Sequence, residues 1–221
     1  MKDLQVNNIP SENQNAKSYF EHGNKGLKIL FVGNSITKHA PKPQVGWTND
    51  CGMAASCLEK DYVHITFNKI QEIQPDSSFA ILQVADFERN FETMDIEKEY
   101  KKAVDYKPDI ILMFFGANVR KTYAEETDRP MDFGVAYEKL RNLLNSHGTA
   151  KIFHCEGFYI RNLGLLDKEK RQVAEKYNDT FIELGDIRTR EDTHGRFNHP
   201  SDKGMQELAD LFFSHIKPYI K

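Results

Sequence analysis

Five short apolar runs recur along the chain, and they limit the fold more than any other feature of the sequence. The apolar residues of each run are mostly consecutive and do not alternate with polar ones, which is typical of strands buried on both faces of a parallel sheet. The runs cover residues 27–33, 78–84, 109–116, 151–157 and 180–186. Because helical segments separate them, we expect right-handed crossovers between the strands. The sequence therefore predicts an α/β protein, a three-layer α/β/α sandwich with a five-stranded parallel sheet.

The expected helices occupy the segments between and after these runs. They cover residues 49–72, 94–106, 132–148, 166–179 and 201–220. Pro108 stops the second of them, because proline cannot continue a helix, and Gly148 suits the C-cap of the third. Residues 62–67, with the sequence YVHITF, fit a strand as well as a helix.

Composition and charge indicate an ordinary soluble protein. Residues 1–25 are polar and rich in asparagine, so we expect an N-terminal arm there and a single domain over residues 26–221. A formal net charge of -3, without a stripe of Lys or Arg, argues against a nucleic-acid partner. No signal peptide is visible, and no stretch approaches the ~20 apolar residues that span a bilayer. The cysteines, Cys51, Cys57 and Cys155, show no close pairing, so we expect a cytoplasmic protein without a membrane partner.

Two of the predicted strands end in glycine followed by small polar residues. These are Gly33-Asn34-Ser35 and Gly116-Ala117-Asn118. In open parallel sheets, ligands bind outside the carboxyl ends of the strands, and glycine lets the backbone turn tightly there. We therefore expect Ser35 and Asn118 to point into one crevice, although each alone could be a simple turn residue.

A histidine follows the last predicted strand, in the loop before the final helix. His199 is followed by Pro200, and Ser201 or Asp202 suits the N-cap of the helix. By itself, such a histidine is an ordinary surface residue. At the same edge as Ser35, however, it could take the proton of the serine hydroxyl and return it to a leaving group.

In order and spacing, these blocks resemble those of the SGNH hydrolases, also called the GDSL esterase/lipase superfamily. The Gly-Asp-Ser-Leu-like block of that family is matched by Gly33-Asn34-Ser35-Ile36. Its Gly-x-Asn-Asp block is matched in part by Gly116-Ala117-Asn118-Val119, and its Asp-x-x-His-Pro block in part by His199-Pro200. The resemblance covers roughly residues 27–217 and implies a flavodoxin-like sandwich.

By this resemblance, Ser35 is the nucleophile of a carboxylic ester hydrolase and His199 is its general base. The backbone N–H of Ser35 and the amide of Asn118 would stabilise the oxyanion, and losing one such donor costs about 3 kcal/mol. We expect short acyl esters, with acetyl groups on a carbohydrate as the substrate that the family favours. No metal or organic cofactor is needed, and the sequence does not predict the oligomeric state.

The sequence departs from the family pattern at the acid that should orient the histidine. Three residues before His199, where the family has Asp, stands Arg196. Arginine cannot hold the imidazole in the required tautomer or stabilise its charge. Either a Ser–His dyad operates, with a backbone carbonyl orienting the ring, or an acid such as Asp192 or Glu156 substitutes. We favour the dyad.

A second departure is the missing glycine that should follow the second strand. The sequence QVADFERNF contains none, so an N–H group from residues 86–89 could complete the oxyanion hole, or Gly52, which we place in the first helix. Glu88 and Arg89 then become candidates for an internal ion pair or for substrate contact, unless they form a surface pair of modest value.

Other polar and aromatic residues are candidate substrate contacts. Asn34 precedes the serine, and Lys38, His39 and Trp47 follow it in a long loop that contains Pro41 and Pro43. Such loops on a rigid sheet often shape a pocket. Trp47 could stack on a sugar or anchor the loop by packing, and Arg120 could bind a carboxylate or phosphate or remain solvated.

Two rival hypotheses start from the same residues. Ser35-Ile36-Thr37-Lys38 fits the Ser-x-x-Lys signature of penicillin-recognising enzymes, but the Lys-Thr-Gly that they need is absent from the sequence. Loss of the acid and of the second-block glycine suits a catalytically degenerate SGNH-fold protein that binds carbohydrate. We predict the esterase and keep the degenerate binder as the alternative.

Overall fold

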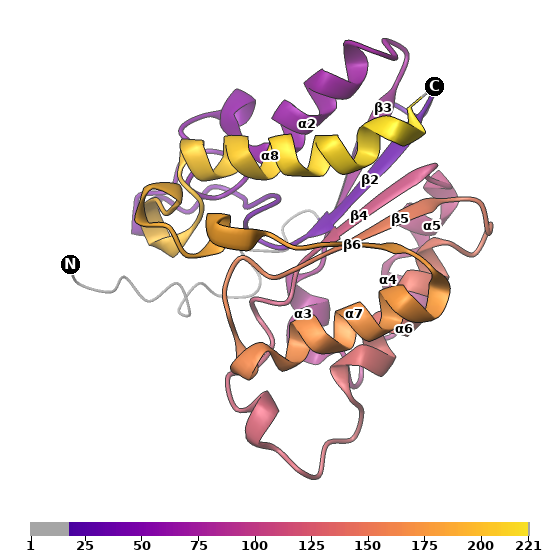
Figure 1. Cartoon of the computed structure of the whole chain (residues 1–221), viewed down its shortest axis with the longest axis vertical. Helices are drawn as coiled ribbons and strands as arrows, with labels where there is room; N and C mark the ends of the chain where they lie inside the picture. The colour runs from indigo at the N-terminus through magenta and orange to yellow at the C-terminus, as the bar shows by residue number, and fades with distance from the viewer. Residues whose placement is uncertain (1–17, 221) are drawn as a thin grey trace.

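The computed structural model describes residues 18–220, which form a six-stranded sheet with helices on both faces (Figure 1). The strand order is β1-β3-β2-β4-β5-β6. Every neighbouring pair is parallel except β1 and β3, so the predicted five-stranded parallel sheet carries one additional antiparallel edge strand. The strands are β1 Tyr19–His22, β2 Lys28–Gly33, β3 Ser78–Gln83, β4 Ile110–Phe114, β5 Lys151–Cys155 and β6 Thr180–Ile182.

The antiparallel strand β1 lies within the segment that the sequence assigns to an arm. Tyr19 pairs with Leu82 of β3, so this part of residues 1–25 belongs to the sheet, whereas residues 1–17 lie outside the described residues. A tight turn at Gly26, with φ of 59°, then leads into β2. β1 pairs with backbone groups of β3 that would otherwise face solvent. This pairing joins two segments that are distant in the sequence.

Helices α2 and α8 cover one face of the sheet, and α3 to α7 lie on the other (Figure 1). Successive side chains of β2 point to opposite faces of the sheet. Ile29 and Phe31 pack with α2 and α8, whereas Leu30 and Val32 pack with α6 and α7. None of the helices in residues 18–220 is long and apolar enough to cross a membrane. The helices are α2 Tyr62–Gln71, α3 Ala85–Asn90, α4 Ile96–Glu99, α5 Lys101–Tyr106, α6 Phe133–Leu144, α7 Leu165–Tyr177 and α8 Asp202–Ile216.

Short 3-10 helices lie in the loops that connect the strands and α-helices. They are η2 Pro43–Val45, η3 Leu58–Lys60, η4 Tyr123–Glu125, η5 Asn162–Gly164, η6 Gly185–Arg188, η7 Glu191–Thr193, η8 Arg196–Asn198 and η9 Lys217–Tyr219. The helix expected over residues 94–106 is divided into α4 and α5 at Tyr100, where φ is −108° and ψ is 16°. The two halves are therefore separate turns instead of one continuous helix.

Residues 62–67, which fit either a strand or a helix, lie in α2. The helix begins only at Tyr62, because Asp61 is its N-cap and accepts a hydrogen bond from the N–H of His64 at 2.8 Å. The same buried carboxylate accepts from the N–H of Gly52 at 3.0 Å. Gly52 is therefore in the loop before α2, and its expected place in the first helix is wrong.

The carboxyl ends of the parallel strands meet at the edge that carries the candidate site. The N–H of Val84, just after β3, donates to the carbonyl of Gly33 at the end of β2 at 2.8 Å. The loop before α8 reaches the same edge, and Ser201 caps that helix by accepting from the N–H of Gly204 at 3.2 Å. A Cβ at Gly204 would lie 2.2 Å from the Thr193 carbonyl oxygen, so glycine lets the loop pack tightly on α8.

Candidate active site

Ser35 and His199 contact each other directly. Ser35 follows β2, and His199 follows η8 in the loop before α8. Oγ of Ser35 lies 2.7 Å from Nε2 of His199. Both side chains are buried, with exposed fractions of 5% for Ser35 and 1% for His199. The hydroxyl proton can therefore pass to the imidazole without an intervening water molecule.

A backbone carbonyl holds the other ring nitrogen of His199. Nδ1 lies 2.8 Å from the carbonyl oxygen of Phe197. Because a carbonyl only accepts hydrogen bonds, Nδ1 carries the proton and Nε2 keeps the lone pair that accepts from Ser35. This geometry is compatible with a Ser–His dyad oriented by a carbonyl, the arrangement that the sequence favours over an acid partner.

An unusual backbone conformation directs this carbonyl. Phe197 has φ of 58° and ψ of 21°, and Asn198 has φ of 56°. The left-handed region costs a bulky residue on the order of 1–3 kcal/mol. Packing offsets this cost, because the Phe197 ring lies edge-on to Trp47 with centroids 6.4 Å apart. The carbonyl of Asn198 also accepts a 2.5 Å hydrogen bond from the hydroxyl of Tyr159.

The two acids named as substitutes have other partners. Asp192 pairs with Arg190 at 3.1 Å and with Lys203 at 2.5 Å. Glu156 pairs with Arg188 at 3.2 Å and also accepts from a backbone N–H at 2.8 Å. Within residues 18–220, neither carboxylate contacts His199, so the geometry supports neither of them as the orienting acid.

Arg196, at the position of the family acid, supports the loop instead. Its guanidinium donates to the carbonyl of Gly46 at 3.2 Å. Its Cζ also lies 4.9 Å from the centroid of the Phe197 ring. Arg196 thus joins the loop before α8 to the loop after Ser35 and helps to hold Phe197.

Burial lowers the pKa of His199 to about 4. The Phe197 carbonyl opposes this shift, whereas His39 and Arg161 lower the pKa further. The imidazole is therefore neutral at pH 7, which is the form that a general base requires.

The turn that carries Ser35 is fixed by local hydrogen bonds. The carbonyl of Asn34 accepts from the N–H of Thr37 at 3.0 Å, and its side-chain oxygen accepts from the N–H of Ile36 at 3.2 Å. A Cβ on Gly33 would lie 1.7 Å from Oγ1 of Thr37. The chain can fold back this closely only because residue 33 is glycine.

Glu88 links the two amides that the sequence places at this edge. Its carboxylate accepts hydrogen bonds from Nδ2 of Asn34 at 3.0 Å and from Nδ2 of Asn118 at 2.5 Å. It also accepts from the backbone N–H of Gly116 at 2.5 Å. The exposed fraction of Glu88 is 0%. The expected alternative of a surface pair is therefore wrong, and Glu88 is an internal acceptor.

Arg89 completes the environment of the Asn118 amide. Its Nη2 donates to Oδ1 of Asn118 at 3.2 Å, and its Nη1 lies 3.6 Å from Asp86. The two polar atoms of the Asn118 side chain are therefore held by residues that are adjacent in α3.

Some of the backbone donors named from the sequence are already engaged. The N–H of Glu88 donates to a carbonyl at the start of α3 at 3.0 Å, and that of Gly52 donates to Asp61. The first turn of a helix leaves its N–H groups without an intrahelical acceptor. In α3 these include the groups of Asp86 and Phe87, but the N–H of Phe87 is hydrogen-bonded to the hydroxyl of Tyr100, so that of Asp86 remains the candidate for the second oxyanion donor.

The loop after Ser35 is held by packing and hydrogen bonds. The Trp47 side chain is 3% exposed, and its Nε1 donates to the carbonyl of His39 at 3.2 Å. Lys38 pairs with Asp50 at 2.7 Å. Nδ1 of His39 contacts the Ala40 carbonyl at 2.5 Å, and burial lowers the pKa of His39. Trp47 thus has the contacts of a packing anchor.

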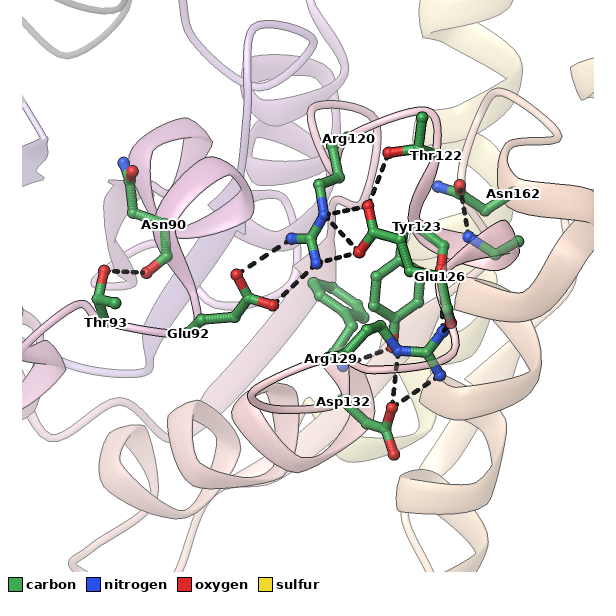
Figure 2. Close-up of polar contacts among 12 residues, drawn as sticks. Asn90, Glu92, Thr93, Arg120, Thr122, Tyr123, Glu126, Arg129, Asp132 and Asn162 are labelled. Carbon is green, nitrogen blue, oxygen red and sulfur yellow. Dashed lines mark hydrogen bonds and ion pairs between the residues drawn. The ribbon is translucent and has the colours of Figure 1, made fainter.

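Arg120 forms ion pairs within the protein. Figure 2 shows its guanidinium between two carboxylates, 2.8 Å from Glu92 and 2.5 Å from Glu126. Its Cζ lies 5.6 Å from the ring centroids of both Phe91 and Tyr123. The side chain therefore connects the loop after β4 to the segment after α3, and its charge is neutralised there.

Sequence reasoning missed two groups near His199. The Phe197 carbonyl could not be found, because no motif reports the direction of a backbone carbonyl. Tyr159 lies edge-on to the imidazole of His199, with ring centroids 6.2 Å apart. The position of Tyr159 just after β5 is a signal that could have identified it, since that strand ends at the same edge.

Comparison with known proteins gives no match at the level of sequence. No known family model matches the chain, and no curated protein matches it either. Solved structures, in contrast, match nearly all of it.

An active-site mutant of a family two carbohydrate esterase from Clostridium thermocellum superimposes with a TM-score of 0.63 at 17% identity, covering 89% of this chain and 64% of that one. A family two carbohydrate esterase from Clostridium thermocellum has also been solved in complex with cellohexaose. A carbohydrate acetylesterase from Sinorhizobium meliloti gives a TM-score of 0.60 at 13% identity, covering 88% and 100%. An acetylxylan esterase from Geobacillus stearothermophilus gives 0.56 at 20%, covering 87% and 95%.

These identities are low, so the likeness concerns the fold. The present chain spans about two thirds, 64%, of the Clostridium thermocellum esterase and almost the whole of the other two. It shares the α/β/α fold of these carbohydrate esterases. The fold that the resemblance implies is confirmed.

Proposed function

We propose that this protein hydrolyses short-chain acyl esters of carbohydrates, with Ser35 as nucleophile and His199 as general base. The observation that carries the proposal is the 2.7 Å contact between Oγ of Ser35 and Nε2 of His199. The Phe197 carbonyl supports it, because it leaves the lone pair of the neutral imidazole directed at the hydroxyl.

The proposed reaction has two halves. Oγ of Ser35 attacks the ester carbonyl carbon while its proton moves to Nε2 of His199, which forms a tetrahedral oxyanion. Asn118 and backbone N–H groups, including that of Ser35, stabilise this oxyanion. Its collapse breaks the ester C–O bond, and the departing alkoxide takes the proton from Nε2. Water, deprotonated by Nε2 of His199, then attacks the acyl carbon. The bond between that carbon and Oγ breaks, Oγ of Ser35 regains its proton from His199, and the acid is released.

The site favours a small acyl group and a sugar alcohol. Ser35 is only 5% exposed, which suits an acetyl group better than a long chain. Carbohydrate as the alcohol rests on the structural neighbours, which are described as esterases of acetylated carbohydrates.

The test is hydrolysis of 4-nitrophenyl acetate and of acetylated xylo-oligosaccharides by the wild-type protein and by Ser35→Ala. We expect turnover that the substitution abolishes. Ser214→Ala is the matched control, because this exposed hydroxyl donates to a carbonyl of its own helix, α8, at 2.7 Å, and it should leave activity unchanged. A fluorophosphonate adduct located on Ser35 by mass spectrometry would identify the nucleophile.

A second candidate function is carbohydrate binding without catalysis. Arg196, which replaces the family acid and bonds to Gly46, is the observation that favours it. No turnover and no fluorophosphonate adduct, together with binding of xylo-oligosaccharides in calorimetry, would favour the binder over the esterase.

A further inference from the structure

A single buried carboxylate joins the serine turn to the Asn118 loop. Oε1 of Glu88 accepts from Nδ2 of Asn34 at 3.0 Å and from the N–H of Gly116 at 2.5 Å, whereas Oε2 accepts from Nδ2 of Asn118 at 2.5 Å. Glu88 has no exposed surface. Both oxygens of Glu88 therefore accept hydrogen bonds, which a neutral amide, with one oxygen and one NH₂ group, cannot reproduce.

These contacts select one of two orientations of the Asn118 amide. The oxygen and nitrogen of an asparagine side chain exchange places when the amide rotates by half a turn. In the observed orientation, Nδ2 donates to Glu88 and Oδ1 accepts from Arg89 at 3.2 Å. The opposite orientation would place Oδ1 against a carboxylate and Nδ2 against a guanidinium. Both contacts would then be repulsive.

An amide nitrogen carries two hydrogens. One hydrogen on Nδ2 of Asn118 is directed at Glu88, so the second is free to donate elsewhere. We propose that Glu88 is a positioning residue that fixes the Asn118 amide so that this second N–H faces the oxyanion formed at Ser35. The inference rests on the proposed function, because it assigns Glu88 a task in that same site.

Glutamine is the informative replacement for Glu88, because it keeps the size and changes one oxygen to NH₂. Its Oε1 can keep the two donors, Asn34 and Gly116. Its Nε2 would then face Nδ2 of Asn118, donor against donor, unless the Asn118 amide turns over. We therefore expect the Asn118 amide to turn over in Glu88→Gln, so that its oxygen faces the introduced amide nitrogen. The N–H of Asn118 would then no longer lie beside the oxyanion.

The kinetic test compares Glu88→Gln with the wild type on 4-nitrophenyl acetate. Loss of one oxyanion donor lowers kcat by about 10²-fold, and we expect this fall with little change in KM. The matched control is Glu92→Gln, which alters a carboxylate four residues later that pairs with Arg120, and it should leave kcat within about twofold of wild type.

A double-mutant cycle identifies the route by which Glu88 acts. If its effect passes through Asn118, Glu88→Gln should lower kcat in the wild type and have almost no further effect in the Asn118→Ala background. Equal losses in both backgrounds would overturn the proposal, as would a change in KM alone.

A spectroscopic measurement keeps the inference separate from the activity. In the wild-type protein, the Asn118 side-chain NH₂ should show one hydrogen with slow exchange and a downfield shift, and Glu88→Gln should abolish that signature. Ordinary, rapidly exchanging signals from Asn118 in the wild type would overturn the proposal even if Glu88→Gln fails to fold. If the signature is present and no ester is hydrolysed, the proposed function is wrong and the positioning of Asn118 by Glu88 stands.

Discussion

The carbonyl oxygen of Phe197 lies 2.8 Å from Nδ1 of His199, while Oγ of Ser35 lies 2.7 Å from the other ring nitrogen. The imidazole is thus held between a backbone acceptor and a hydroxyl donor. A carboxylate in the place of the carbonyl would stabilise the imidazolium more strongly, because it carries a full charge. The low pKa of His199 agrees with the weaker partner, and it sets the pH range in which the site can work.

The pH dependence of kcat/KM should reflect this low pKa. The proposed base must be neutral, so activity is retained while the pH stays above the pKa of His199 and falls once the imidazole binds a proton. Because that pKa is about 4, instead of the ordinary 6.5, we expect a nearly constant kcat/KM between pH 6 and 8 and an acid limb below about pH 5. Steady-state rates across buffers of constant ionic strength would check this, and a half-loss near pH 6.5 would contradict it.

Folding stability should depend on the same group. The pKa of His199 is lower in the folded than in the unfolded chain, so the unfolded chain binds more protons between pH 6.5 and about 4. Stability is therefore fully present above pH 6.5 and falls on acidification through this range, by on the order of 3 kcal/mol in total. Urea unfolding at several pH values should show a smaller decrease for His199→Gln. Equal slopes for the variant and the wild type would exclude this contribution.

Restoring the family acid should not increase activity. Nδ1 of His199 already donates to the Phe197 carbonyl, and Arg196 bonds instead to Gly46. We therefore expect Arg196→Asp to leave kcat unchanged or to lower it a few-fold, by loosening the loop that carries Phe197. Arg196→Lys, which keeps the positive charge, is the control. An increase of tenfold or more in the Asp variant would show that the carbonyl is an inadequate partner.

Trp47 should affect stability and kcat more than substrate affinity. The indole is buried and packs edge-on against Phe197, whose carbonyl holds His199. Trp47→Ala should lower the free energy of unfolding by about 3–5 kcal/mol, whereas Trp47→Phe keeps a ring and loses about 1 kcal/mol with the hydrogen bond to His39. Chemical denaturation and kinetics of both variants test this. A large increase in KM without loss of stability would instead identify Trp47 as a sugar contact.

Arg120 should matter for stability and not for catalysis. Glu92 and Glu126 both pair with it (Figure 2). Replacement by methionine removes the cation between these two carboxylates and leaves Arg129 as the remaining positive neighbour of Glu126, so we expect a small but measurable loss of stability, because ion pairs near the surface are screened by solvent. Urea unfolding measures the loss, while kcat and KM should be unchanged. A selective increase in KM for esters that carry an anionic group would show that Arg120 reaches the substrate.

The strands that build the parallel sheet could be predicted because their apolar runs are continuous. β1 could not, since Tyr19–His22 is only four residues long and half of it is exposed. Its pairing with β3 is a long-range choice that no local pattern reports. Two of the predicted helices also differ from the structure. The first begins only after Asp61, which accepts from the N–H of Gly52, and the second is broken at Tyr100.

In the site, side chains were easier to anticipate than backbone groups. Ser35 and His199 follow elements whose order predicts a common edge, and they lie within hydrogen-bonding distance. The role of the Phe197 carbonyl depends on a left-handed residue that is neither glycine nor asparagine, so propensity argues against it. Glu88 stands in the charged sequence ADFERN, which looks like a solvated helix, yet the three N–H donors around it come from segments far away in the chain.

The two outer strands of the sheet have a consequence for how copies of this protein could associate. β1 has four residues and β6 has three, so each border offers only a brief run of hydrogen-bonding groups to a neighbouring chain. Short borders of this kind discourage the extension of one sheet into another. Any stable association between copies would then use helix surfaces or loops. A sheet that continues from one molecule into the next is not expected.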